Sequence, residues 1–194
     1  MWRISIRLVV VMRSFTFTAQ HNNKSHLLTH RLISMASSTA TKAIGLGFVG
    51  LSANGWASNA LAPPLFQAPL NDQYKLVAVS TSRAASAEES AKVHTEKTGH
   101  VVKGYHGSTE AIAADPDVQF VAVAVKVPDH AAAIKPILAA KKDVFSEWPL
   151  ARNLEEAKEL AVLAKEAGVR TLVGLQEWQS PLVNKVRMEL LTAG

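Results

Sequence analysis

Residues 143–153 of the sequence, "DVFSEWPLARN", place a carboxylate, an indole and a proline at the end of a short apolar run. The run predicts a buried strand, Asp143 to Ser146, and Glu147, Trp148 and Pro149 then form a corner before the next helix. In open α/β sheets, ligands bind outside the carboxyl ends of the strands. Glu147 can exchange a proton there, whereas the indole N–H of Trp148 donates a hydrogen bond but does not titrate. The corner therefore predicts a ligand site in which Trp148 stacks on a flat ring or forms an apolar wall.

A second candidate site is the glycine-rich segment "KAIGLGFVGLSANGW". It contains a literal G-x-G-x-x-G that begins at Gly45, but this register would make the polar "STATKAI" the preceding strand. A turn that begins at Gly50 gives a fully apolar strand over 43–49 instead. The loop then runs from Gly50 to Gly55, and such a loop after the first strand of a βαβ unit binds the pyrophosphate of a dinucleotide.

In this register Ser52 takes the place of the middle glycine, and its hydroxyl can donate to a phosphate oxygen. The alternative is a glycine-rich turn that binds no ligand. The loop residues expected to contact a cofactor are Gly50, Leu51, Ser52, Gly55 and Trp56.

The end of the second predicted strand bears on the choice of cofactor. Folds that bind NAD usually end this strand with Asp or Glu, which holds the ribose hydroxyls. Here the sequence reads "STSR", and no carboxylate follows until Glu88. Ser80, Thr81 and Arg83 suit a 2′-phosphate, so the cofactor is NAD or NADP; the alternative is a solvated loop.

Apolar runs alternate with helical patterns from Lys42 onward, which is typical of βαβ units. These elements predict a three-layer α/β Rossmann domain over 42–194, with a mostly parallel, doubly wound sheet. Asn153 is expected to cap one helix, and Ser86 with Glu89 to form a capping box on another. The predicted strands cover 43–49, 75–80, 101–105, 118–125, 143–146 and 169–175.

The composition excludes several kinds of chemistry. The chain has no cysteine, so disulfides, thiolate zinc sites and a cysteine nucleophile are excluded. The histidines after residue 42 lack the spacing of metal ligands, and no metal site is predicted. His94 and His100 are expected to be solvated residues near a helix end.

The basic character of the chain belongs to its first 41 residues. They hold five of the 21 Lys and Arg residues and none of the 16 acidic ones, so the remainder is neutral and its charge does not predict nucleic-acid binding. The longest apolar run of this tail, Leu8 to Met12, is too short to span a bilayer. Either residues 1–34 are a transit peptide for the mitochondrion, or translation starts at Met35 and the protein belongs to the cytoplasm and nucleus.

The order of these motifs resembles the nucleotide-binding domain of the Gfo/Idh/MocA oxidoreductases over residues 42–194. In that family the corner reads Glu-Lys-Pro and the lysine is catalytic, whereas this chain has Trp148. The resemblance therefore implies a degenerate corner without a catalytic residue. The further cofactor contacts that it implies are Val125, Val127, Pro128, His130, Glu147, Trp148 and Gln176. For His130 the alternative is that it caps the next helix together with Asp129.

"GFVGLSANGW", "VAVKVPDH" and "EWPL" are similar to the galactose-regulon repressor branch of this family in fungi. That branch implies a non-catalytic, dinucleotide-binding regulator that binds a transcription activator and responds to a galactokinase-like sensor. It also implies homodimerisation through the family's C-terminal α+β domain. That domain is expected to be absent from this chain. One alternative is an oxidoreductase acting on a sugar or polyol through another proton donor, such as Glu147 or His130. The other is a truncated pseudo-domain that binds nothing.

Overall fold

The computed structural model describes residues 42–192. The predicted basic tail, residues 1–41, lies outside the described residues. Among the described helices, none is long and apolar enough to cross a membrane.

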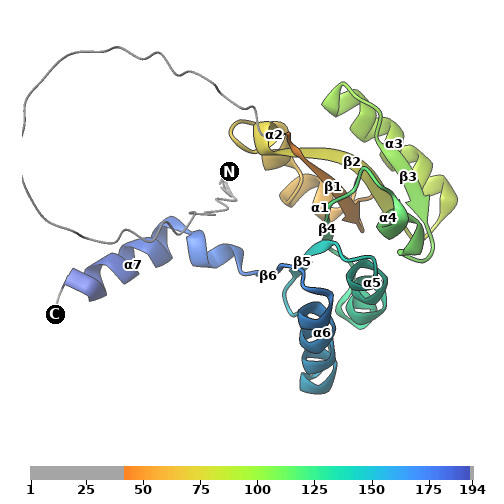
Figure 1. Cartoon of the computed structure of the whole chain (residues 1–194). Coiled ribbons are helices and arrows are strands. Elements are labelled where there is room, and N and C mark those ends of the chain that lie inside the picture. The colour runs from red at the N-terminus through yellow and green to blue at the C-terminus, as the bar shows by residue number, and fades with distance from the viewer. Residues whose placement is uncertain (1–41, 193–194) are drawn as a thin grey trace, which may run out of the picture.

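Six parallel strands form one sheet in the order β3-β2-β1-β4-β5-β6 (Figure 1). The chain builds the sheet outward from β1 to β3, returns to the centre at β4, and then builds outward to β6. The prediction of a doubly wound parallel sheet is confirmed, and the strand order reverses between β1 and β4. The strands are β1 (Ile44–Val49), β2 (Tyr74–Thr81), β3 (Lys103–His106), β4 (Phe120–Val123), β5 (Asp143–Glu147) and β6 (Thr171–Gly174).

Strands β4 and β6 are shorter than the predicted ranges 118–125 and 169–175, because apolar residues that precede them take part in turns. At the start of β4 the amide of Val118 donates to Asp115 O at 3.2 Å. Before β6 the amide of Val169 donates to Ala164 O at 3.3 Å, in the turn that ends a helix. Burial of a residue therefore does not by itself place it in the sheet.

Helices cover the two faces of the sheet and give the three predicted layers. One apolar cluster joins the sheet to α1 (Trp56–Ala60), η1 (Pro63–Phe66) and α3 (Ala84–Thr98). A second cluster, on the other face, joins it to α4 (Glu110–Ala114), α5 (Val127–Ala139) and α6 (Leu154–Ala167). The remaining helices are α2 (Leu70–Gln73), η2 (Gln176–Gln179) and α7 (Pro181–Thr192).

One of the two predicted helix caps is confirmed. Asn153 Oδ1 accepts a hydrogen bond from the Glu156 amide at 2.9 Å at the start of α6. The capping box at Ser86 is wrong, because α3 already begins at Ala84. The Ser86 hydroxyl donates to the carbonyl oxygen of Arg83 at 3.0 Å and is therefore turned back toward the end of β2.

Among residues 42–192, no helix covers the β6 end of the sheet face that carries α1 and α3. Leu172 on β6 is 51% exposed, although its register partner Phe145 on β5 is buried. Helix α7 has no buried residue, and both figures show it leading away from the sheet. The apolar side chains left exposed here include Leu172, Leu175, Trp178, Leu182, Val186 and Leu190.

His94, on α3, was expected to be solvated, and this prediction is wrong. Its side chain is fully buried and its ring packs 6.2 Å from that of Phe66. Nδ1 donates to Ser90 O at 2.7 Å, while Nε2 is the one buried side-chain N or O atom without a hydrogen-bond partner among residues 42–192. Burial therefore lowers the pKa of His94 from its ordinary value of 6.5, outweighing the bond to Ser90, and Lys97 lowers it further.

The burial of His94 predicts a loss of stability in mild acid. Below pH 6.5 the unfolded chain binds a proton at His94 that the folded chain does not. The free energy of unfolding therefore falls by up to about 1.4 kcal/mol per pH unit until the folded-state pKa is passed. Urea unfolding at pH 7.5, 6.5 and 5.5 measures this slope. His94→Asn keeps a donor near Ser90 O and removes the titrating nitrogen, so it should flatten the slope; an equal slope in both proteins would contradict the prediction.

Candidate functional site

The glycine loop begins at Gly50, as its apolar strand predicted. β1 ends at Val49, and Gly50 has a φ of +89°, which L side chains rarely adopt. Its amide donates to Ser80 O on β2 at 2.8 Å, and a Cβ atom at this position would overlap the carbonyl oxygen of Ala124. Gly50 therefore lets the chain leave β1 between its two neighbouring strands, at the point where the strand order reverses.

The loop backbone is held from the protein side. Leu51 is fully buried, and Ser90 of α3 donates its hydroxyl proton to Leu51 O at 2.5 Å. The hydroxyl of Ser58 donates to Ser52 O. A Cβ at Gly55 would overlap the Oγ atom of Ser52, so Gly55 leaves the space that the Ser52 hydroxyl occupies. The loop from Gly50 to Gly55 is therefore a glycine cradle of fixed backbone shape at the carboxyl end of β1, where a pyrophosphate binds in this type of fold.

The predicted ribose residues at the end of β2 separate into a buried pair and an exposed cation. Ser80 and Thr81 are buried. The Thr81 hydroxyl donates to Arg83 O at 3.1 Å and lies 2.6 Å from the Ser86 hydroxyl, so these oxygens hold the start of α3. Arg83 itself is exposed.

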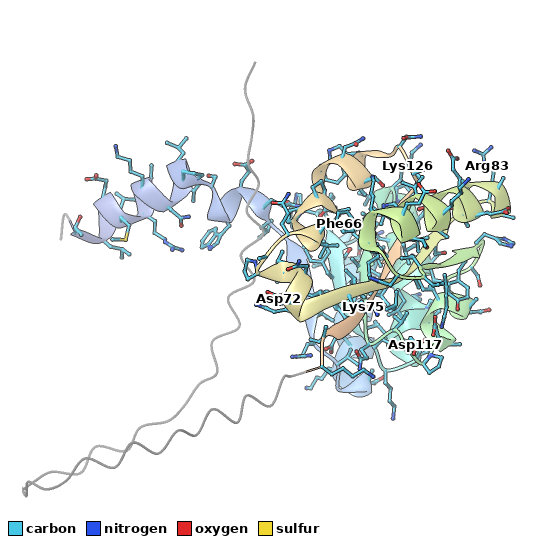
Figure 2. All side chains as sticks on the ribbon, turned by 90° about the horizontal axis from the view of Figure 1, so that it is seen from above. Phe66, Asp72, Lys75, Arg83, Asp117 and Lys126 are labelled. Carbon is cyan, nitrogen blue, oxygen red and sulfur yellow. The ribbon has the colours of Figure 1, made fainter. Side chains whose placement is uncertain are left out.

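A further cation at this edge was missed. Lys126 follows β4, is exposed, and precedes α5. Figure 2 shows Arg83 and Lys126 at one edge of the sheet and Asp117 at the opposite edge. Its sequence signal is the lysine that interrupts the apolar run "VAVAVKV". Two cations at the carboxyl edge favour the approach of a phosphate.

At the corner after β5, a hydrogen bond fixes the side chain of Glu147, whereas the side chain of Trp148 is exposed. Glu147 Oε1 accepts a hydrogen bond from Gln176 Nε2 at 2.6 Å, and the Trp148 side chain is 65% exposed. Burial raises the pKa of Glu147, and the bond from Gln176 offsets part of this rise. A Cβ at Gly174 would lie 2.7 Å from Phe145 Cζ and 3.0 Å from Glu147 Oε1, so this glycine, which was not predicted as part of the site, makes room for both side chains.

His130 lies behind the corner instead of at its surface. Its side chain is fully buried, with Nε2 3.0 Å from Val125 O and Nδ1 3.2 Å from Leu150 O. Direct contact of this ring with a ligand is not available in this arrangement. Of the other predicted residues near α5, Val127 is half-buried and Pro128 is exposed in the first turn of the helix.

The lysine that precedes β5 does not substitute for a lysine at the corner. Lys142 Nζ donates to Asp115 O at 2.7 Å and to Val118 O at 2.5 Å, at the amino end of the sheet. Burial lowers the pKa of Lys142, and Asp115 opposes this effect. Among the residues that the structure describes, no group of three or more potential ligands could hold a metal ion.

A doubly wound parallel sheet with a glycine cradle at its point of reversal defines a dinucleotide-binding Rossmann domain. The model of the oxidoreductase family with an NAD-binding Rossmann fold, Gfo/Idh/MocA, matches residues 44–175. The chain therefore belongs to this family, whose cofactor is NAD or NADP, and the predicted resemblance is confirmed.

The relatives include both dehydrogenases and a regulator. The chain is 42% identical over 156 residues to the dehydrogenase aclE of Aspergillus oryzae, covering 79% of this chain and 41% of that protein. It is 28% identical over 158 residues to the galactose/lactose metabolism regulatory protein GAL80 of Saccharomyces cerevisiae, covering 78% of this chain and 35% of that protein. The chain thus spans about two fifths of the length of these curated relatives.

Solved structures give the same two groups. A super-repressor mutant of Gal80p from Saccharomyces cerevisiae matches 78% of this chain and 39% of its own, with a TM-score of 0.67 and 27% identity. KijD10, a 3-ketoreductase from Actinomadura kijaniata in complex with NADP and TDP-benzene, matches 76% of this chain and 42% of its own, with a TM-score of 0.62 and 27% identity.

The cradle predicts that Gly50→Ala abolishes dinucleotide binding. The new methyl group would overlap Ala124 O at a φ of +89°, so the loop must move. Gly99→Ala is the matched control, because Gly99 has a φ of +71° but nothing lies within 4 Å of its Cβ position. We expect Gly99→Ala to lower the free energy of unfolding by about 1 kcal/mol and to leave binding intact. Calorimetric titration with NAD and NADP measures the difference, and equal binding by both variants would disprove the role of the cradle.

Proposed function

We propose that the chain is a NAD(P)-binding domain that acts as a non-catalytic regulator similar to Gal80p. The observation that carries this proposal is Trp148, whose indole stands exposed where the family resemblance places a catalytic lysine. An indole does not exchange protons, and the neighbouring Glu147 is already bonded to Gln176. The site then binds its dinucleotide without turning it over.

The described residues offer each part of a dinucleotide a chemically suitable group. The pyrophosphate approaches the loop from Gly50 to Gly55, which follows the first strand at the point where the strand order reverses. The adenosine end reaches Arg83, whose guanidinium matches a 2′-phosphate and favours NADP. The nicotinamide supplies a flat ring on which the indole of Trp148 can stack. Bound NADP would supply hydride chemistry, to which Trp148 contributes no proton.

The regulator assignment is supported by likeness to Gal80p in both sequence and structure. A transcription activator and a galactokinase-like sensor are the partners that it implies, in the cytoplasm and nucleus, with homodimerisation as a further part of the proposal. In this arrangement the occupancy of the dinucleotide site controls the partner surface.

A second candidate function is that of an oxidoreductase acting on a sugar or polyol. The 42% identity to the dehydrogenase aclE favours it. Glu147 is then the proton-transferring group, because burial raises its pKa above the ordinary value and it lies beside the nicotinamide end of the proposed site.

Arg83 gives a test of cofactor choice. Arg83→Ala should weaken NADP binding about 10- to 100-fold, because a charge-assisted hydrogen bond contributes about 1.5–3 kcal/mol. NAD has no 2′-phosphate, so its affinity should not change. Calorimetric titration of wild type and variant with both dinucleotides measures this. An equal loss for NAD and NADP would place Arg83 elsewhere in the site.

Turnover separates the two candidate functions. We expect the wild-type chain to bind NADP but to reduce no NADP⁺ with a panel of aldoses and polyols, followed by absorbance at the wavelength of the reduced nicotinamide. Trp148→Lys restores an amine at the corner, and any turnover that appears would identify the missing group. Wild-type turnover that disappears in Glu147→Gln would overturn the proposal in favour of the oxidoreductase. A folded chain that binds neither dinucleotide would leave only the non-binding pseudo-domain.

A further inference from the structure

The two halves of the proposed site come from opposite sides of the strand reversal. The glycine loop follows β1 and rests on the end of β4, since a Cβ on Gly50 would meet Ala124 O and lie 3.0 Å from Val125 Cγ1. The corner with Trp148 follows β5. The ladder between β4 and β5 ends at Val123 and Ser146, so the pairing of these two strands does not itself join the end of β4 to Leu150 in the corner.

His130 bridges this gap. It projects from the first turn of α5, with Nε2 3.0 Å from Val125 O at the end of β4. Nδ1 lies 3.2 Å from Leu150 O, two residues after Trp148. One fully buried ring thus contacts the backbone beneath the glycine loop and the backbone of the corner.

The contact of the ring with the corner is a hydrogen bond only if the ring nitrogen is the donor. A carbonyl oxygen only accepts, so Nδ1 must carry a proton to bond to Leu150 O. A neutral ring carries one proton, so it donates to Leu150 O in one tautomer and to Val125 O in the other. The Ser146 hydroxyl, 3.3 Å from Nδ1, is the remaining polar group in contact with the ring.

We propose that His130 is a positioning residue for the dinucleotide site, which fixes the Trp148 corner relative to the end of β4 through the bond from Nδ1 to Leu150 O. Without this bond the corner is free to shift at Leu150, and Trp148 no longer stands opposite the loop that holds the pyrophosphate. His130 acts through Trp148 and does not touch the ligand. The inference rests on the proposed function for its effect on affinity, but its effect on Trp148 is independent of any ligand.

Two amide variants separate the contacts of the ring. The amide nitrogen of Asn stands near the place of Nδ1, and that of Gln stands near the place of Nε2. His130→Asn therefore keeps a donor for Leu150 O, whereas His130→Gln keeps a donor for Val125 O. Ser146→Ala is the matched control, because it removes the 3.3 Å contact and leaves both carbonyl contacts in place.

The first measurement uses the full chain labelled with 5-fluorotryptophan, without nucleotide. Trp148→Phe identifies the Trp148 fluorine resonance. We expect His130→Gln to move or broaden this resonance, while His130→Asn and Ser146→Ala leave it near its wild-type position. The Trp178 resonance should stay in place in all three variants. Identical Trp148 resonances in the Asn and Gln variants would overturn the proposal.

The second measurement is NADP affinity, with urea unfolding of each variant alongside. We expect His130→Gln to raise the dissociation constant at least tenfold and His130→Asn to stay within about threefold of wild type, although both variants lose stability. Equal affinities would reduce His130 to a structural role. If neither the wild-type chain nor any variant binds NADP, the proposed function fails. The fluorine resonances still decide the role of His130 in that case.

A measurement on the wild-type chain covers the case in which His130→Gln does not fold. Nitrogen-15 spectra of the histidine rings show which ring nitrogens carry a proton. The proposal requires a proton on Nδ1 of His130, and an unprotonated Nδ1 would overturn it.

Discussion

The close approach of Gly50 to the carbonyl oxygen of Ala124 is the constraint on which the site depends. Three parallel strands meet there: β1 ends, its loop bonds to the end of β2 through Ser80 O, and the loop rests on the end of β4. A side chain at residue 50 would separate these strands at the position where a ligand must reach the backbone. The absence of a side chain therefore lets the three strand ends lie close together and sets the shape of the loop.

Much of this arrangement could be predicted because it is encoded locally. The apolar residues before Gly50 identified β1, and with it the register of the loop, although a literal motif began five residues earlier at Gly45. The corner at Glu147 followed from a short strand and a proline. Asn153 was recognisable as a cap because its partner, the Glu156 amide, lies in the same turn.

The features that the sequence did not reveal are contacts between segments that are distant along the chain. His94 was expected to be solvated, but it is buried and its ring packs against Phe66 in η1. His130 was predicted as a cofactor contact or a helix cap, and the structure places its ring beside Val125 O and Leu150 O. A histidine is compatible with water, a ligand or two carbonyl groups, and its pattern in the sequence does not distinguish among them. Gly174 was missed for a similar reason, because its need for space comes from Phe145 and Glu147 on the neighbouring strand.

The apolar side chains exposed on β6 and α7 contribute differently to the stability of the fold and to contacts with other molecules. In a closed core, an apolar side chain adds to the stability of the fold and is hidden from other molecules. Leu172, Leu182 and Leu190 remain in water, so each leaves unrealised much of the roughly 1.5–3 kcal/mol that full burial of such a side chain contributes. The fold of residues 42–192 thus gains little from them, and they stay available for contact with other molecules. Within this part of the chain, the apolar burial that stabilises the fold is concentrated on the sheet and its covering helices, while β6 and α7 carry apolar surface that no other element covers.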